Sequence, residues 1–314
     1  MAVHVLRRLI QGIPVVLFAS IFVFSILQLV PGDPATNIAG PDASDEDVEI
    51  IRDRLGLDKP LPQQYLSWIG SAVRGDLGDS FRSSRPVSEL LTDALAPTLE
   101  LTLVAFTIEL VLGVILGVMA GTRLRSAWDW GLSAFTIIGI AIPNFVLGLV
   151  LLYVVGFKLE WLPIGGRVPL TEDPIEGLRY LALPSLVLGI TGAAVLARFV
   201  RTSIAQVMNQ DYIRTARAKG LAARAVVLRH GLRNGLVPVV TVMALQFAAL
   251  LTGSVVVESV FSRPGVGRLV VSSIQARDYP VVQGALLFLV FGFIVINLAA
   301  DIMYGILDPR IRFS

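Results

Sequence analysis

Apolar residues occur in this chain in repeated runs of about twenty, separated by polar and charged segments. An α-helix needs a run of that length to cross a hydrocarbon core of about 30 Å, whereas a buried helix of a soluble protein needs only about 10–14 apolar residues. The pattern predicts six transmembrane helices, at about 9–30, 99–121, 132–156, 180–200, 236–258 and 281–306. We therefore expect an all-α integral membrane protein.

The first apolar run predicts a retained span and not a cleaved signal peptide. It is longer than the apolar region of a signal peptide, and the sequence that follows, Val30-Pro31-Gly32-Asp33-Pro34, is not a small-residue cleavage site. Pro14, Pro143 and Pro184 fall inside predicted spans, where we expect kinks whose freed backbone groups are satisfied by neighbouring helices.

The distribution of charge predicts which side of the membrane each segment faces. If residues 1–8 form a cytoplasmic N-terminus, the inner segments carry these basic residues: Arg7, Arg8, Arg123, Arg125, Arg198, Arg201, Arg214, Arg217, Lys219, Arg224, Arg229, Arg233, Arg310 and Arg312. The outer segments then hold most of the acids. This orientation satisfies the positive-inside rule and the reverse orientation violates it, so both termini are expected in the cytoplasm.

A polar segment, 31–97, separates the first two spans and has predicted helices of its own. Ser44 followed by three acids is typical of an N-cap and predicts a helix through about Leu55. A second helix is predicted over about 62–73 and a short third helix over 87–95. We expect this segment to be extracytoplasmic. It has two interpretations: it contacts a binding protein or the transport path, or it is a passive cap.

Composition excludes most chemistry that would need a catalytic site within this chain. Hydrophobic residues make up 54% of the sequence and charged residues 16%, against about 25% charged in an average soluble domain. Without cysteines there is no thiolate catalysis, and His4 and His230 alone make a histidine-rich metal site or Ser/His/Asp chemistry improbable. No lysine is followed by Ser or Thr, so the chain has no phosphate-binding P-loop.

The inner region 201–235 carries a short predicted helix with a distinct surface. Tyr212, Thr215, Ala216 and Lys219 have the spacing of one helical face, and Gly220 can end the helix in a left-handed conformation. A second helix is predicted from about 224 to 234. By itself this pattern also fits a basic interfacial loop that only anchors two spans.

The stretch from Tyr212 to Leu221 resembles the coupling-loop signature of ABC-importer permeases of the dipeptide/oligopeptide/nickel family. Arg214-Thr215-Ala216 stands where the wider importer class has Glu-Ala-Ala, and the interval from Gly220 to Pro238 is longer than usual. Both departures are typical of this subfamily. The long segment after the first span is similar to that of the B-type of its two paired permeases.

The resemblance extends over nearly the whole chain. The stretches that carry it are Val30-Pro31-Gly32-Asp33-Pro34, Leu55-Gly56-Leu57-Asp58, Pro62-Gln63-Gln64-Tyr65, Gly75-Asp76-Leu77-Gly78, Arg85-Pro86-Val87, Ile142-Pro143-Asn144-Phe145, Leu162-Pro163-Ile164-Gly165-Gly166, Phe261-Ser262-Arg263-Pro264-Gly265-Val266-Gly267 and Leu307-Asp308-Pro309-Arg310.

The resemblance implies a type I ABC-importer permease core over 98–314 in a bacterial cytoplasmic membrane. It also implies three kinds of protein partner: a second, C-type permease, two cytoplasmic ATPase subunits that use ATP and Mg, and an extracytoplasmic substrate-binding protein. The chain itself would bind no cofactor, metal or nucleic acid. Tyr212, Thr215, Ala216, Lys219 and Gly220 would contact an ATPase. Short peptides are the expected solute, with nickel chelates and haem as alternatives within the family.

Three polar residues inside predicted spans are candidates for the translocation path. A carboxylate within a membrane is costly to bury, so Glu109 is a functional candidate, although it also fits helix packing. Asn144 and Gln246 could line the path or bond across helices. The outer turn Phe261–Arg268 has two interpretations, a contact with the binding protein and a plain turn.

Two other classes of membrane protein compete with the importer interpretation. A secondary transporter or channel driven by an ion gradient predicts several coupled intramembrane charges or broken helices in repeated positions. Glu109 is nearly alone, and no inverted repeat is evident. An intramembrane enzyme would need a nucleophile with its base, or metal ligands, at one depth, and the sequence does not offer them.

Overall fold

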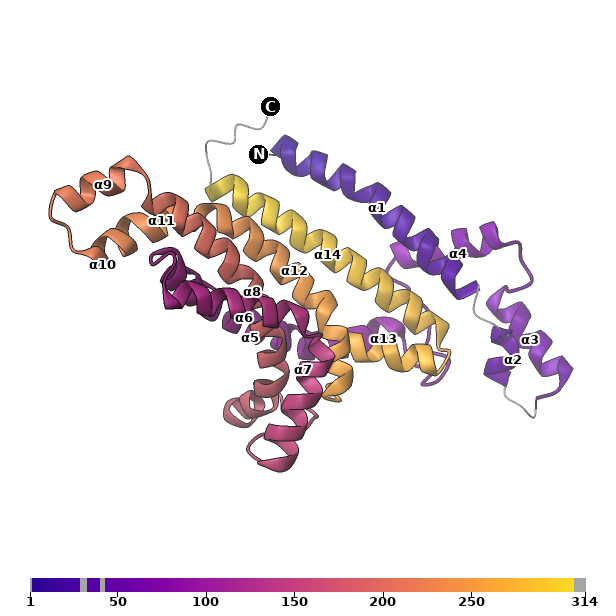
Figure 1. The fold of residues 1–314 in the computed structure, drawn as a ribbon. Helices are drawn as coiled ribbons and strands as arrows, with labels where there is room; N and C mark the ends of the chain where they lie inside the picture. The colour runs from indigo at the N-terminus through magenta and orange to yellow at the C-terminus, as the bar shows by residue number, and fades with distance from the viewer. Residues whose placement is uncertain (1, 29–32, 40–42, 308–314) are drawn as a thin grey trace.

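The computed structural model describes residues 2–28, 33–39 and 43–307 (Figure 1). Within these ranges the regular structure is helical, apart from an isolated antiparallel bridge between Asp79 and Pro86. The helices are α1 (Ala2–Gln28), α2 (Pro34–Ala39), α3 (Asp45–Leu55), α4 (Leu61–Val73), α5 (Val87–Gly121), α6 (Ala127–Ala141), α7 (Asn144–Leu151), the π-helical η1 (Leu152–Lys158), α8 (Pro174–Met208), α9 (Asp211–Ala218), α10 (Ala223–Ala225), the π-helical η2 (Val226–Leu232), α11 (Arg233–Gly235), α12 (Val237–Val260), α13 (Val266–Gln275) and α14 (Tyr279–Leu307).

Four helices in the described ranges, α5, α8, α12 and α14, are long and apolar enough to cross a membrane, or five if the bent pair formed by α6 with α7 and η1 counts as one. The apolar part of α1 is shorter, Ile10–Ser25. α1 nevertheless packs along α14, and Figure 1 shows the two helices side by side. Residues 29 and 30 of the predicted first span lie outside the described ranges.

Helices α5 and α8 form the closest contact in the bundle, through glycines. A Cβ atom added to Gly117 would lie 2.6 Å from Val200 Cβ and 2.7 Å from the carbonyl oxygen of Ala197. Three glycines of α5 meet α8 in order: Gly113 contacts Leu196, Gly117 contacts Val200 and Gly121 contacts Ile204. At these contacts the residue numbers increase in the same direction along both helices. α5 and α8 therefore run parallel.

The parallel arrangement decides how the segment between these helices crosses the membrane. α5 and α8 both run from the same side to the other, so the chain must return once between them. The only apolar helices available for this are α6 and α7 with η1, which are bent by 98° at Ile142–Pro143. The bent pair is therefore a broken span and not a re-entrant loop.

The prediction of one continuous helix over 132–156 was wrong, because the helix is interrupted at Ile142–Pro143. Ile142 is extended, with φ −86° and ψ 118°, and Pro143 precedes the first turn of α7. The residue before a proline is disfavoured in the helical region, and proline lacks the N–H that would continue the hydrogen-bond ladder. The expected kink at Pro143 is thus a complete break, whereas Pro14 and Pro184 lie inside continuous helices.

The helix predicted over 87–95 is also not separate from the second span. Both belong to α5, which is continuous through Pro97. The polar groups beside this proline find other partners: Thr98 Oγ1 donates to the carbonyl of Ala94 at 3.2 Å, and Arg263 Nε donates to the carbonyl of Pro97 at 3.2 Å. At 1.5 Å per residue, α5 is about 52 Å long and extends beyond the bilayer.

The polar segment after α1 folds much as its capping signals predict. The Ser44 side chain accepts from Asp47 N while Asp47 accepts from Ser44 N, which is a capping box, and α3 ends at Gly56 in a left-handed conformation. The segment is attached to the bundle through Asp278, which accepts from Ser80 Oγ at 2.6 Å and Phe81 N at 3.1 Å. Figure 1 shows α2 and α3 at the end of the molecule far from α9.

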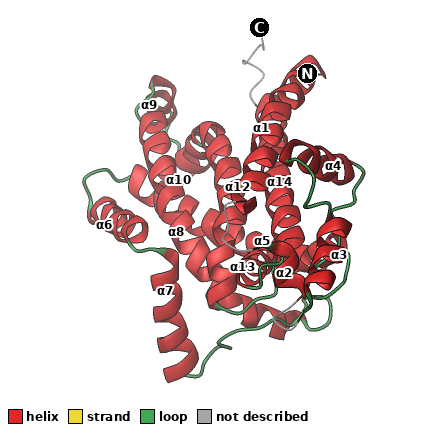
Figure 2. Cartoon of the chain, turned by 90° about the vertical axis from the view of Figure 1, so that its right-hand side faces the viewer, coloured by secondary structure: helices red, strands yellow, loops and turns green. Residues whose placement is uncertain are grey.

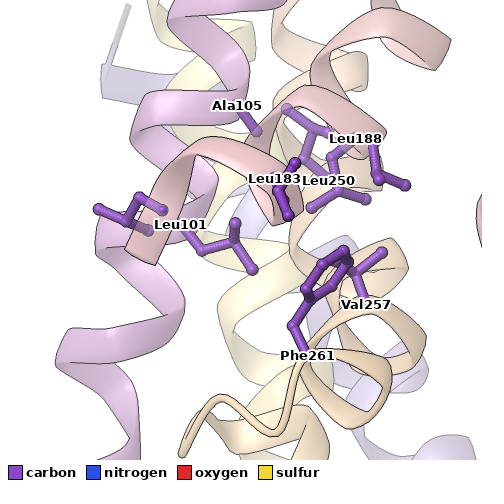
Figure 3. Packing of buried hydrophobic residues seen from close by; sticks show 9 residues of the cluster. Leu101, Ala105, Leu183, Leu188, Leu250, Val257 and Phe261 are labelled. Carbon is purple, nitrogen blue, oxygen red and sulfur yellow. The ribbon is translucent and has the colours of Figure 1, made fainter. Parts of the chain in front are cut away.

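The main apolar core lies between α5, α8 and α12 (Figure 3). Each helix contributes buried side chains to it, and the cluster closes on Phe261 just after α12. Its buried members are Leu101, Ala105, Leu181, Leu183, Val187, Leu188, Leu250, Val257 and Phe261.

Substitution of Gly117 by alanine tests the close helix contact. We expect Gly117→Ala to lower the free energy of unfolding by about 1–3 kcal/mol, because the added methyl group has no room. Gly292→Ala, within α14, is the matched control because a Cβ there meets nothing within 4 Å. Thermal unfolding of both purified variants measures the difference, and equal stability of the two would contradict the proposed packing.

Candidate functional site

The predicted inner helix is present as α9, and it ends where the sequence indicates. Lys219 caps its C-terminus, and Gly220 follows with φ +76°. A left-handed φ favours glycine, and no atom lies within 4 Å of where its Cβ would be, so the glycine is needed for conformation and not for space. Tyr212, 43% exposed, lies with Thr215 on the open surface.

Ala216 does not share this open surface. It is 6% exposed and packs with Ile213 and Val226 in a small apolar cluster. The four residues predicted for one face therefore divide: Tyr212, Thr215 and Lys219 are exposed, and Ala216 faces inward. The sequence interpretation overlooked Ile213, although apolar residues three apart on a short helix are the usual sign of a buried edge.

The inner region is anchored firmly to the end of α8. Val207 and Met208, at the end of α8, pack against the cluster beneath α9. Ser203 Oγ donates to the carbonyl of Gly235 at 2.6 Å, and a Cβ on Gly235 would lie 2.6 Å from Ile204 Cδ1. The second predicted helix, 224–234, is α10, η2 and α11 in succession over 223–235. Movement of α9 would therefore be passed directly to α8 and α12.

An ion pair at the same end attaches α6 to α8. Arg201 Nη2 lies 2.9 Å from Asp129 Oδ2, and Arg201 Nε also donates to this carboxylate. The Arg125 backbone N–H completes the set at 2.9 Å. At this end of the molecule α6, α8 and α9 are thus held together by polar and apolar contacts.

The three candidates for the translocation path lie around one point on α8. Gln246 Nε2 donates to Glu109 Oε1 at 3.2 Å, so α12 and α5 are joined across α8. Thr191 Oγ1 donates to Asn144 Oδ1 at 2.8 Å, which joins α8 to the start of α7. A Cβ on Gly192 would lie 2.2 Å from Glu109 Oε2.

Glu109 is completely buried in this chain and lies directly against the α8 backbone at Gly192. Its Oε2 atom has no hydrogen-bond partner among the described residues. Glu109 thus contacts both α8 and α12 from α5. Asn144 and Gln246 are partly exposed and each bond across helices.

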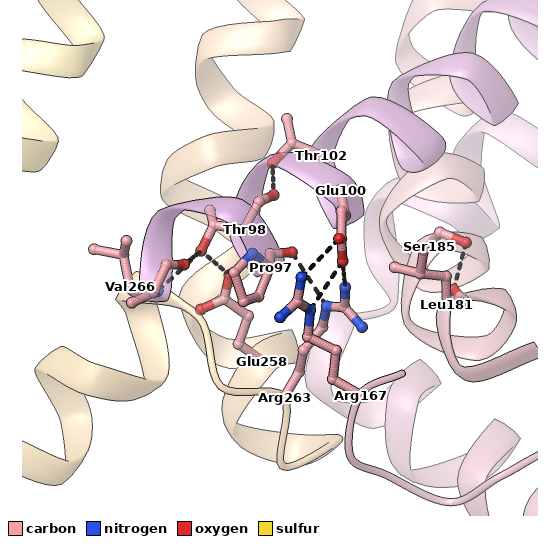
Figure 4. Close-up of polar contacts among 11 residues, drawn as sticks. Pro97, Thr98, Glu100, Thr102, Arg167, Leu181, Ser185, Glu258, Arg263 and Val266 are labelled. Atoms are coloured by element: carbon pink, nitrogen blue, oxygen red, sulfur yellow. Dashed lines mark hydrogen bonds and ion pairs between the residues drawn. The ribbon is translucent and has the colours of Figure 1, made fainter. Parts of the chain in front are cut away.

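A second polar cluster, at the end of the spans far from α9, was not predicted. Arg263, fully buried in the turn after α12, donates through Nη2 to Glu100 Oε2 at 2.6 Å (Figure 4). Arg167 donates to both oxygens of the same carboxylate, at 3.1 and 2.8 Å. Burial lowers the pKa of the Arg263 guanidinium, while the negative charge of Glu100 opposes that shift. Glu100 thus joins α5 to two outer loops.

Glu258 lies beside this cluster and caps α13. It accepts from Gly267 N at 2.8 Å and from Arg268 N at 3.2 Å, at the positive end of the helix dipole. Thr98 Oγ1 donates to it at 2.7 Å, which connects α5 to the same point (Figure 4). A Cβ on Gly265 would lie 2.3 Å from this carboxylate. The outer turn is therefore a buried structural junction.

Family comparison agrees with this architecture. The family description "Binding-protein-dependent transport system inner membrane component" matches residues 113–313, and the N-terminal description of the same kind of component matches residues 1–102. The chain is 44% identical over 312 residues to the Glutathione transport system permease protein GsiC of Escherichia coli (strain K12), covering 99% of both chains. It is 44% identical over 315 residues to a putative peptide transport system permease protein of Brucella abortus (strain 2308), covering 100% of both.

Solved structures share the fold at low sequence identity. The inward-facing MetNI methionine ABC transporter in its native crystal form matches with a TM-score of 0.58 and 20% identity, over 70% of this chain and 96% of that one. An amino acid ABC transporter matches with a TM-score of 0.52 and 17% identity, over 71% and 95%.

Together the helical bundle and the family matches define a multi-pass membrane permease subunit of an ABC importer. The chain belongs to the family of binding-protein-dependent transport system inner membrane components.

Loss of the Glu100 carboxylate tests the outer cluster. We expect Glu100→Gln to destabilise the protein by about 3–5 kcal/mol, because the fully buried Arg263 would lose its partner charge. The matched control is Glu89→Gln, on the same helix, whose pair with Arg85 is exposed and contributes about 0–1 kcal/mol. Thermal unfolding in detergent compares them, and a loss no larger than that of the control would show that the cluster is not structural.

Proposed function

We propose that this chain conducts short peptides, or a related solute, across the cytoplasmic membrane as one of two permeases of an ATP-driven importer. A substrate-binding protein would deliver the solute from outside, and two cytoplasmic ATPase subunits would supply the energy. The observation that supports this most directly is α9, an exposed short helix fixed rigidly to the ends of two spans. The similar permeases named for glutathione and peptide transport support the solute class.

The orientation follows from charge. α9 and the N-terminal end of α1 lie at the same end of the molecule (Figure 2), and basic residues gather in the segments there. The positive-inside rule favours that end in the cytoplasm, with α2, α3 and α13 outside. α9 would then be on the side where ATP is available.

In the proposed cycle, closure of the ATPase dimer on ATP displaces α9, and the displacement passes into the bundle. Tyr212, Thr215 and Lys219 would contact the ATPase groove, with Gly220 setting the end of the helix. Ala216 would act indirectly, by packing α9 onto Val226. Since α8 and α12 are attached to this unit, the spans would rock as a rigid body between inward and outward states.

The chain would perform no covalent chemistry. ATP and Mg would be used by the partner ATPases, and we propose no cofactor bound by this subunit. The sequence supports this, because it contains neither a P-loop nor a nucleophile with a credible base. Glu109, Asn144 and Gln246 stay candidates for the path, as residues that join the helices which would move against one another.

Affinity purification of the tagged chain from its native membrane in mild detergent tests the proposal. We expect mass spectrometry to find a second permease and two ATPase subunits with the wild type. Tyr212→Ala should reduce ATPase recovery by about tenfold, equivalent to about 1.4 kcal/mol, while the second permease stays bound. Leu228→Ala, another exposed large side chain of the inner region, is the matched control.

The opposite outcome is equally specific. Recovery of the chain alone or as a homo-oligomer, with no effect of Tyr212→Ala, would favour a transporter driven by an ion gradient. Uptake of a labelled dipeptide into vesicles that responds to ionophores, and not to ATP, would lead to the same conclusion.

A further inference from the structure

Helix α4 lies unusually deep for part of an extracytoplasmic segment. Tyr65 Oη forms a hydrogen bond of 2.9 Å with Ser20 Oγ, and the rings of Tyr65 and Trp68 pack on Phe24 of α1. Ser20 is eight residues before Gln28, the end of α1, which is about 12 Å along the helix axis. It is also inside the apolar stretch Ile10–Ser25. α4 therefore contacts α1 at the level of the hydrocarbon core.

The composition of α4 fits that depth. Its thirteen residues, LPQQYLSWIGSAV, include no charged side chain, while Lys59 and Arg74 lie just beyond its ends. None of its residues is buried in the structure. A helix without charged side chains can lie among acyl chains at low cost, and Lys or Arg at its flanks can extend to the headgroups.

The faces of α4 have different surroundings. Tyr65 and Trp68 form the edge that packs on α1. Gln64, Ser67 and Ser71 line a cleft of about 480 Å³ toward α3 and α14. The remaining apolar face carries Leu66, Ile69 and Val73, spaced three and four residues apart as on one side of a helix.

Within the part of the chain that the structure describes, this apolar face is largely open. Leu66 is 65% exposed and Val73 82% exposed. On α1, Phe18 and Phe22 are 72% and 65% exposed, on the side of the helix turned away from Ser20 and α4. Among the described spans α1 packs mainly on α14, and the side chains that it turns away from the bundle face lipid. Figures 1 and 2 both show α4 next to α1, and Figure 2 places it nearer the N-terminal end of α1 than α2 and α3 are.

We infer that α4 is immersed in the outer leaflet of the bilayer, with Leu66, Ile69 and Val73 in contact with phospholipid acyl chains. The polar face of the helix lines the cleft on the other side, and Lys59 and Arg74 reach the headgroup region. The segment 31–97 is thus not wholly extracytoplasmic. It holds α1 in place from the lipid side, where the bundle itself offers only α14.

Site-directed spin labelling tests this directly, because the wild-type chain has no cysteine to remove. The full chain, with the subunits that co-purify with it, is reconstituted in phosphatidylglycerol/phosphatidylethanolamine vesicles. Leu66→Cys and Val73→Cys carry the label. Phe18→Cys is the lipid reference, and Glu46→Cys, exposed on the charged helix α3, is the water reference. Collision rates with oxygen and with a neutral water-soluble nickel chelate are compared.

Labels at 66 and 73 should collide with oxygen and exclude the nickel chelate to the same extent as at 18, with an oxygen-to-nickel ratio about tenfold above that at 46. Nickel accessibility equal to that at 46 would overturn the inference and place the face in water. Low accessibility to both reagents would also overturn it, because a protein partner would then cover the face.

Two neighbouring substitutions give an independent readout. Leu66→Asp should reduce the amount of folded protein in the membrane several-fold, because it places a charge on the lipid-facing side. Ser67→Asp lies on the polar face one residue away and should leave the amount unchanged. Equal tolerance of the two would contradict lipid contact.

Discussion

The parallel contact between α5 and α8 is the constraint on which the rest of the structure depends. Transmembrane helices gain little from the hydrophobic effect when they associate, so close packing must replace it. Here the packing is reciprocal: glycines of α5 receive α8 side chains toward the end near α9, and Gly189 and Gly192 of α8 receive Ile108 and Glu109 of α5 nearer the middle. A shift of either helix by one residue would press side chains against backbone, so the register is fixed.

That fixed register makes α8 the element through which a signal at one end can reach the other. Its inner end carries the cluster of Ile213 and Val226 under α9, and Arg201 pairs with Asp129 of α6. Its middle contacts Glu109 of α5, whose carboxylate bonds to α12. Interiors packed this tightly move as units and do not deform gradually. A push on α9 is therefore more easily accommodated by rotation of the bundle than by bending within it.

The sequence predicted the elements well where local chemistry decides and less well where distant residues do. Apolar runs located the long helices, Ser44 located the start of α3, and Gly220 located the end of α9. The complete break at Pro143 and the unbroken helix at Pro97 have the same residue type at their centre. Arg263, far along the chain, donates to the carbonyl of Pro97, a contact that the local sequence does not show. The cluster of Glu100, Arg167 and Arg263 was not predicted from the sequence. These residues are far apart along the chain, and only the fold brings them into contact.

The charged junctions lie at the two ends of the bundle, and this placement follows from the cost of burying charge. At the outer end Glu100 is shared by Arg167 and Arg263, and at the inner end Asp129 pairs with Arg201. Midway along the spans, apolar side chains and glycines make most of the contacts, with the polar bonds around Glu109 and Asn144 as exceptions. Ion pairs near the interfaces keep their geometry with less desolvation than pairs at the bilayer centre. Ion pairs thus join the helices at both ends of the bundle, and close packing joins them between the ends. This arrangement is suited to rigid-body rotation about the middle of the bundle.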